Sequence, residues 1–144
     1  MALSQIGQVA HDFWSQIPSH FPNAKLDVFQ VMPNHIHGII ILSGDLITAR
    51  NSYSINDNDG DRKKNEYFKE ITPKAGSIST IIRSYKSSCS KHINLITPDH
   101  GFFWQPRYYD HIIRNNEEYF RIKNYIINNP KHWKQDKFFN ERNF

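Results

Sequence analysis

Two histidines, His35 and His37, stand one residue apart at the head of an apolar, β-branched run in residues 31–42 (VMPNHIHGIIIL). Such a run predicts a buried strand. Side chains alternate between the faces of a strand, so both imidazoles should point the same way, about 7 Å apart along the strand at ~3.3 Å per residue. Two imidazoles on one face can converge on a single metal ion. The pair therefore predicts part of a metal site that other residues must complete.

A hairpin is expected to hold this pair. Residues 26–31 alternate apolar and polar side chains, which predicts a half-buried strand. Pro33 and Asn34 have the chemistry of a tight turn, because proline fixes φ and asparagine tolerates the left-handed region. We expect Leu26–Met32 and His35–Leu42 to pair as an antiparallel hairpin.

Helices are predicted on both sides of this hairpin in the sequence. The first has apolar residues at intervals of three and four over residues 3–17, and Pro18 and Pro22 should end it. The second starts near Pro73. Its apolar stripe, which core packing explains, consists of Ile78, Ile81, Ile82, Tyr85, Cys89, His92 and Ile96. Its basic, hydroxyl-rich face is open to two interpretations, a solvated surface or a phosphate-binding one.

The remaining segments are less regular. Residues 43–72 are rich in Ser, Asn, Asp and Gly without periodicity, which predicts a long mobile loop. Residues 102–113 are expected to form a strand interrupted near Pro106, at a sheet edge or a bulge. A further helix should follow Asn115 or Asn116 and stop at 128–130, and residues 131–144 should be a C-terminal arm.

Composition bounds the class of protein. A chain of 144 residues without an evident linker favours one domain, 1–144. Residues 1–60 carry 2 Lys/Arg and 5 Asp/Glu, whereas residues 61–144 carry 16 and 9. The basic half, with its interleaved aromatics, suits either nucleic acid or a solvated surface. A single cysteine excludes a disulfide framework and a thiolate cluster. No apolar run of ~18 residues and no signal peptide is visible, so we expect a cytoplasmic protein.

The helix after residue 115 offers what the histidine pair lacks. Tyr125 and Asn129 are four residues apart and so should share one helical face. A carboxamide oxygen beside two imidazoles suits Mg²⁺ or Mn²⁺ better than a closed zinc site. A tyrosine hydroxyl next to such a metal can attack phosphorus and form a phosphotyrosine. A tyrosine on a helix more often has a structural role than a nucleophilic one, and the spacing alone leaves both interpretations open.

Four blocks of the sequence, in order, resemble the single-tyrosine HUH transposases, and most closely the group of REP-associated tyrosine transposases. The blocks are residues 32–38 (MPNHIHG), 76–86 (from Gly-Ser-Ile to Lys86), 104–115 (WQPRYYDHIIRN) and 125–130 (YIINNP). The resemblance implies that His35 and His37 are metal ligands, that Tyr125 is the nucleophile and that Asn129 is the third ligand. It also implies cleavage of single-stranded DNA beside hairpins, with a retained 5′-phosphotyrosine and a released 3′-hydroxyl.

A single-stranded substrate gives other residues a role by their type. Bases can stack on Trp104 or Tyr108, although packing in the core or at an edge explains both aromatics equally well. Arg83, Lys86 and Arg107 can hold phosphates.

One departure from the family concerns the first strand of the sheet. Family members begin with a basic segment and a strand, which is central in a ferredoxin-like sheet, whereas this chain starts at the first helix. Neighbouring strands would then carry unpaired backbone groups. Either the chain is cropped, or another segment or another protomer completes the sheet, or the domain is a decayed remnant. We therefore expect a homodimer or strand exchange.

The sequence thus predicts an α+β domain with a ferredoxin-like (RRM-like), mostly antiparallel sheet, two helices on one face and the Tyr125 helix against the site. The expected function is metal-dependent nicking and joining of hairpin-flanked single-stranded DNA in the cytoplasm, at the nucleoid. The rival is a catalytically inactive protein that binds hairpin or single-stranded DNA. A histidine-triad nucleotide hydrolase is set aside, because it needs a histidine two residues after His37 and the chain has Ile39 there.

Overall fold

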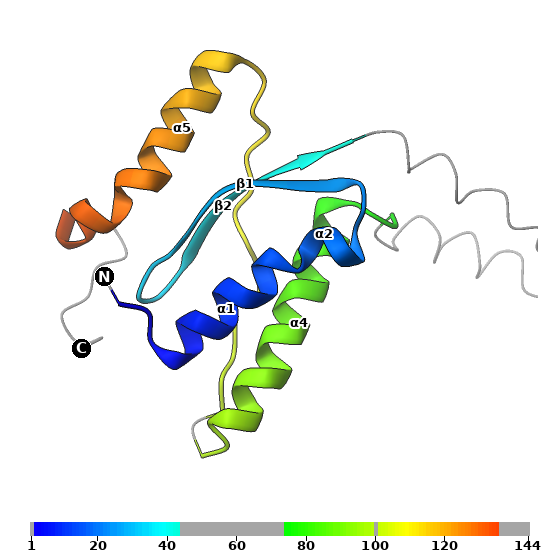
Figure 1. The fold of residues 1–144 in the computed structure, drawn as a ribbon, viewed down its shortest axis with the longest axis vertical. Coiled ribbons are helices and arrows are strands. Elements are labelled where there is room, and N and C mark those ends of the chain that lie inside the picture. The colour runs from blue at the N-terminus through cyan, green and yellow to red at the C-terminus, as the bar shows by residue number, and fades with distance from the viewer. Residues whose placement is uncertain (1, 44–73, 100, 136–144) are drawn as a thin grey trace, which may run out of the picture.

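The computed structural model describes residues 2–43, 74–99 and 101–135 (Figure 1). Its elements follow the chain in the order α1 (Gln5–Ser15), α2 (Ile17–His20), β1 (Ala24–Val31), β2 (Ile36–Leu42), α4 (Ile78–Ile96), α5 (Asn116–Asn128) and the 3₁₀ helix η2 (Asn129–Gln135). Among the described residues, no helix is long and apolar enough to cross a membrane.

The first predicted helix is confirmed over most of its length, but it ends differently. Ser4 caps α1, and its hydroxyl accepts the backbone N–H of Gly7 at 3.1 Å. The helix breaks at Gln16 rather than at Pro18, which instead lies in the first turn of α2. Proline is tolerated there because a first-turn N–H has no partner within its helix.

The predicted hairpin is confirmed, with small shifts at its ends. Strands β1 and β2 pair antiparallel, in a register that runs from Ala24 opposite Leu42 to Val31 opposite Ile36. The pairing is irregular between Leu26 and Phe29, as at a β-bulge. The Met32 N–H donates to the His35 carbonyl at 2.9 Å and closes the turn, so His35 lies just before the first residue of β2.

The hydrophobic core lies on one face of this hairpin, beneath α1 and α4 (Figure 1). The Trp14 indole stacks on Phe29, with ring centroids 4.3 Å apart, and the Tyr85 hydroxyl donates to the Ala10 carbonyl at 2.9 Å. The buried stripe of α4 differs slightly from the predicted one, because Ile93 is buried whereas His92 is exposed. The start of α4 is Ile78, capped by Ser77, and Pro73 lies outside the described residues.

Helix α5 covers the opposite face of the hairpin (Figure 1). Asn115 is its N-cap as predicted, and its side chain accepts the Glu118 N–H at 2.8 Å. Ile126 is the buried residue of α5. The hairpin is therefore the middle layer of three, and helices lie on both of its faces.

The strand predicted over residues 102–113 is wrong, since none of the described residues 101–113 belongs to a strand. Side chains of α4 take the place of a strand ladder. Lys86 Nζ donates to the carbonyls of Gln105 and Arg107 at 2.8 and 3.0 Å. The Asn94 side chain accepts the Phe102 N–H at 2.6 Å and donates to its carbonyl at 3.3 Å. Backbone groups satisfied in this way need no neighbouring strand.

The described sheet consequently has two antiparallel strands, β1 and β2. The α+β class is confirmed, and the ferredoxin-like arrangement stays a prediction. The C-terminal arm predicted from residue 131 is wrong for residues 131–135, because they continue η2 and Trp133 is buried. Residues 136–144 and the loop predicted at 43–72, apart from Ser43, lie outside the described residues.

Candidate metal and tyrosine site

The two histidines meet at the turn end of the hairpin. Their Nε2 atoms lie 2.9 Å apart, and the two rings are nearly perpendicular. His35 Nδ1 is 2.8 Å from the Asn34 side-chain oxygen. If Nδ1 carries the proton and donates it to that oxygen, the Nε2 lone pair of His35 faces His37. Asn34 then fixes the ring orientation that a histidine ligand requires.

The pair points toward α5 and η2 rather than into the core. Ile36 and Ile40, which alternate with the histidines, pack against the Trp14 core. On the other face, the His37 ring is edge-on to Tyr125, with ring centroids 5.4 Å apart. The His35 ring lies 5.8 Å from the ring of Trp133. Because side chains alternate along the strand, the histidines lie on the face of the hairpin opposite the Trp14 core.

Asn129 lies between these two aromatic contacts along the chain, four residues after Tyr125 and four before Trp133. It is 4% exposed, and its amide Nδ2 is buried without a hydrogen-bond partner among the described residues. A buried amide group that lacks a partner costs free energy, on the order of 1–3 kcal/mol. Nδ2 is a hydrogen-bond donor, so an acceptor such as a phosphate or water oxygen would satisfy it, whereas a cation would bind the side-chain oxygen Oδ1.

The spacing of the two imidazole nitrogens is compatible with a divalent cation. Two nitrogen ligands at about 2.1 Å from an octahedral ion, at a right angle, are about 3.0 Å apart. The observed separation of the two Nε2 atoms, 2.9 Å, is close to that value. No cluster of three or more His, Cys, Asp or Glu side chains suited to a metal occurs among the described residues. A site here would accordingly combine the histidine pair with the Asn129 amide and with oxygen atoms of water or substrate.

Tyr125 is the half-exposed member of this group. Its side chain is 52% exposed, so a large ligand can reach it, although it lies beside His37. The sequence predicts that Tyr125 and Asn129 share one side of a helix, and the structure has Asn129 as the C-cap of α5 with helical backbone angles. The hairpin and α5 thus bring the histidine pair and Tyr125 together, and Asn129 lies one helical turn after Tyr125.

Two of the residues predicted to bind DNA, Lys86 and Trp104, instead make contacts within the protein. Lys86 holds the two backbone carbonyls described above, and burial lowers the pKa of its ammonium group. Trp104 packs against Phe102 and Tyr85, and its indole nitrogen is buried. Both residues support the segment 101–107, and the Trp104 ring is thereby used in the core cluster.

The other three predicted residues are at the surface. Arg83 and Arg107 are exposed, and the Tyr108 ring is 40% exposed. The Tyr108 hydroxyl is 2.9 Å from that of Ser79 on α4. None of the described contacts brings Arg83 or Tyr108 to the histidine pair.

Sequence reasoning missed two kinds of residue. Trp133 contacts His35, and its spacing of four from Asn129 was the available signal. The second kind is a polar cluster of Asp27, Tyr119 and Lys123, in which the Tyr119 hydroxyl and the Lys123 ammonium group both donate to the Asp27 carboxylate. Asp27 is 92 residues from Tyr119, and no local pattern in the sequence connects them.

Fold and site together define an α+β protein in which a His-x-His pair on a hairpin faces a tyrosine on a helix. A protein of Haemophilus influenzae strain Rd, described as an uncharacterized protein, is 30% identical to this chain over 142 residues, which are 96% of the chain and 72% of that protein. The chain belongs to the same family as that protein. No family model matches the chain, and no solved structure is significantly similar to it.

Proposed function

We propose that this protein nicks and rejoins single-stranded DNA beside hairpins, in the manner of a transposase, with Tyr125 as the nucleophile. The observation that carries the proposal is the convergence of the His35 and His37 Nε2 atoms at 2.9 Å beside the Tyr125 ring. The resemblance to HUH transposases over residues 32–38 and 125–130 supports it. We also propose that the protein acts in the cytoplasm, at the nucleoid, as a homodimer.

His35, His37 and Asn129 would hold Mg²⁺ or Mn²⁺, which when bound would supply a Lewis acid at the scissile phosphodiester. The Tyr125 hydroxyl oxygen forms a bond to phosphorus and its proton passes to water, while the bond from phosphorus to the 3′-oxygen breaks and that oxygen takes up a proton from water. The products are a 5′-phosphotyrosine and a 3′-hydroxyl. Because the phosphoester is retained, attack by a 3′-hydroxyl on the phosphotyrosine reverses the step and joins strands without ATP.

The second candidate is a protein that binds hairpin or single-stranded DNA without cutting it. One observation favours it: the described sheet has only two strands, and residues 101–113 add none. A catalytic constellation must be held within a fraction of an ångström, which a wider sheet does better than a hairpin. Both candidates predict salt-sensitive DNA binding, and they differ in covalent chemistry.

The test is incubation with labelled hairpin-bearing single-stranded DNA and Mn²⁺, followed by a denaturing gel. The expected result is a protein-linked DNA band that disappears with EDTA and in Tyr125→Phe. Tyr109→Phe is the matched control, because that side chain is 93% exposed and should leave the band unchanged. Binding without an adduct would select the second candidate, and a band that persists in Tyr125→Phe would refute the assigned nucleophile.

A further inference from the structure

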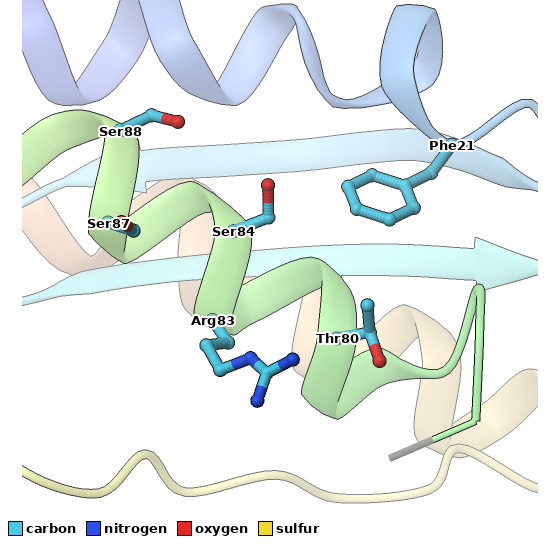
Figure 2. Close-up of a pocket in the computed structure, with 6 residues that line it drawn as sticks. All are labelled: Phe21, Thr80, Arg83, Ser84, Ser87 and Ser88. Carbon is cyan, nitrogen blue, oxygen red and sulfur yellow. The ribbon is translucent and has the colours of Figure 1, made fainter. Parts of the chain in front are cut away.

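A second polar site lies on α4, away from the histidine pair. We call it the hydroxyl groove; it has a volume of about 440 Å³ and is lined by Phe21, Thr80, Arg83, Ser84, Ser87 and Ser88 (Figure 2). Phe21 follows α2, whereas the other five residues belong to α4. In Figure 2, Ser84 and Ser88 point to the side of α4 on which the Phe21 ring lies, and Arg83 extends from the other edge of the helix.

Helical spacing explains why these side chains gather. Thr80, Ser84 and Ser88 follow one another at intervals of four, and Arg83 and Ser87 form a parallel row. The apolar row of Ile81, Tyr85 and Cys89 is buried in the core. The face of the helix that lines the groove is thus left to hydroxyl groups and Arg83.

The polar groups of the groove have unused hydrogen-bonding capacity. The Thr80 hydroxyl donates to the Lys74 carbonyl at 2.9 Å and is occupied. In the part of the chain that the structure describes, the hydroxyls of Ser84, Ser87 and Ser88 make no hydrogen bond, and Arg83 pairs with no carboxylate. A guanidinium beside several hydroxyl donors is suited to a phosphate oxygen, because it is always charged and presents its N–H groups as a fork.

The aromatic wall narrows the class of ligand. Phe21 is partly buried and packs on the core with one side, while it lines the groove with the other. A phosphate held by Arg83 and a base stacked on Phe21 are the two halves of a nucleotide in a single strand. A protein or lipid partner would need one of these features, and single-stranded nucleic acid uses both.

We propose that the hydroxyl groove holds a phosphodiester of single-stranded DNA and is an anchoring site separate from the nicking site. This inference relies on the proposed function only for the identity of the ligand, DNA. It does not depend on Tyr125 being a nucleophile. The groove lies beside α4, which packs on the core face of the hairpin, while the histidines and Tyr125 lie on the opposite face. A strand held in the groove therefore contributes affinity for DNA and leaves the reacting atoms untouched.

The test measures binding in a Tyr125→Phe background, where covalent chemistry cannot interfere. Fluorescence anisotropy with a labelled hairpin-bearing single strand is recorded across a series of salt concentrations. Arg83→Gln should weaken binding by about tenfold, the effect of losing a hydrogen bond to a charged group. It should also reduce the slope of log K against log salt by about 0.7, the value for one phosphate on a single strand. A variant with Ser84, Ser87 and Ser88 all replaced by alanine should weaken binding at every salt concentration and keep that slope.

The matched control is Lys91→Gln, which removes one exposed positive charge from the same helix outside the groove. Equal losses for Arg83→Gln and Lys91→Gln would overturn the proposal, since they would reduce the effect to net charge. Calorimetry with inorganic phosphate alone separates the two sources of the anion. Arg83-dependent phosphate binding without any change in DNA affinity would also overturn it. Because all variants are at the surface, unchanged thermal melting is the check on folding.

The outcome is independent of the nicking assay. If no covalent adduct forms but Arg83→Gln still weakens binding with the expected salt slope, the groove is confirmed and the transesterase fails. If the adduct forms and Arg83→Gln binds as tightly as the parent protein, the groove is refuted and the transesterase stands.

Discussion

The space above Gly38, one residue after His37, is filled by an indole ring. A Cβ at this position would lie 2.4 Å from Cζ2 of Trp14 and 3.1 Å from the Phe29 ring. Both rings belong to the stacked pair at the centre of the core. Glycine is thus required here by close packing. The same packing holds the strand that carries His37 close to α1, so the position of the histidine pair depends on a residue without a side chain.

Gly38→Ala should destabilise the protein by about 1–3 kcal/mol, the range for overpacking a core. Gly7→Ala is the matched control, because a Cβ there meets its neighbours at an ordinary 3.5 Å inside α1. Alanine in a helix is favoured over glycine by about 1 kcal/mol, so Gly7→Ala should leave stability equal or higher. Denaturant unfolding measures both, and a neutral Gly38→Ala would show that Trp14 moves aside without cost.

The second prediction at the scale of single residues concerns the reactivity of Cys89. Its side chain is fully buried, and burial raises the pKa of the thiol from 9.0 to about 11. The thiolate is the reactive form, so at pH 8 the raised pKa alone lowers its population by about a hundredfold. Modification by a thiol reagent should be very slow in the native protein and fast in denaturant. Rapid stoichiometric labelling without denaturant would contradict the burial of Cys89 on the core face of α4.

At the scale of elements, the position of α5 decides whether Tyr125 meets the histidines. The cluster of Asp27, Tyr119 and Lys123 fixes this helix to β1. Lys123 Nζ lies 2.9 Å from the Asp27 carboxylate and 3.0 Å from the Tyr119 hydroxyl, which itself donates to Asp27. These bonds lie in the two helical turns before Tyr125. The cluster therefore acts on the site by orienting the helix that carries the tyrosine.

Hydrogen bonds from Tyr119 and then Lys123 lower the pKa of the Asp27 carboxyl below its usual value of 3.8. The unfolded chain therefore takes up the proton first, so the contribution of Asp27 is present above pH 3.8 and is lost as the pH falls through its lowered pKa. Asp27→Asn should cost about 1–2 kcal/mol at pH 7. Its deficit relative to the parent protein should shrink on acidification, as followed by thermal unfolding from pH 7 to pH 3.

The control for this experiment is Asp12→Asn, which changes an exposed carboxylate on α1. Its difference from the parent protein should be small across the same pH range. In the nicking assay, Asp27→Asn should slow formation of the covalent adduct more than it weakens DNA binding, because it loosens the tyrosine helix without removing a DNA contact. An adduct formed at the parental rate would show that the cluster does not position Tyr125.

The elements differ in how far sequence reasoning could predict them. Local signals sufficed for the hairpin and for the start of α5, because Pro33-Asn34 and the Asn115 cap act within a few residues. The segment 102–113 has the composition of a strand, but Lys86 and Asn94 of α4 bond the backbone of Phe102, Gln105 and Arg107 instead. The Asp27 cluster likewise joins distant parts of the chain. Long-range polar pairing is what the sequence pattern does not contain.

At the scale of the whole molecule, two kinds of exposed surface stand out. Strands β1 and β2 pair only with each other among the described residues, and an isolated two-stranded sheet is marginal without packing on its faces. Helices supply that packing here, but not partners for the outer strand edges. The second surface is the segment 101–113, which exposes large apolar side chains, with Phe103 at 86%, Tyr109 at 93% and Ile112 at 70% exposure. Unpaired edges and exposed aromatics are features of surfaces that associate.

We therefore expect the protein to form a homodimer, as the sequence also predicts. A second copy that adds backbone pairing at the outer edge of β2 would cover the unpaired groups. Multi-angle light scattering should give twice the monomer mass of 17.0 kDa. Replacing Tyr109 and Ile112 by serine tests whether the exposed segment takes part, since the weakened dimer should then dissociate at concentrations at which the parent protein stays dimeric.

Mixing Tyr125→Phe with His37→Ala tests exchange of active sites: restored adduct formation requires the tyrosine of one protomer to meet the histidines of the other. A strictly monomeric, well-folded protein that forms the adduct would show that the histidines and Tyr125 of one chain suffice.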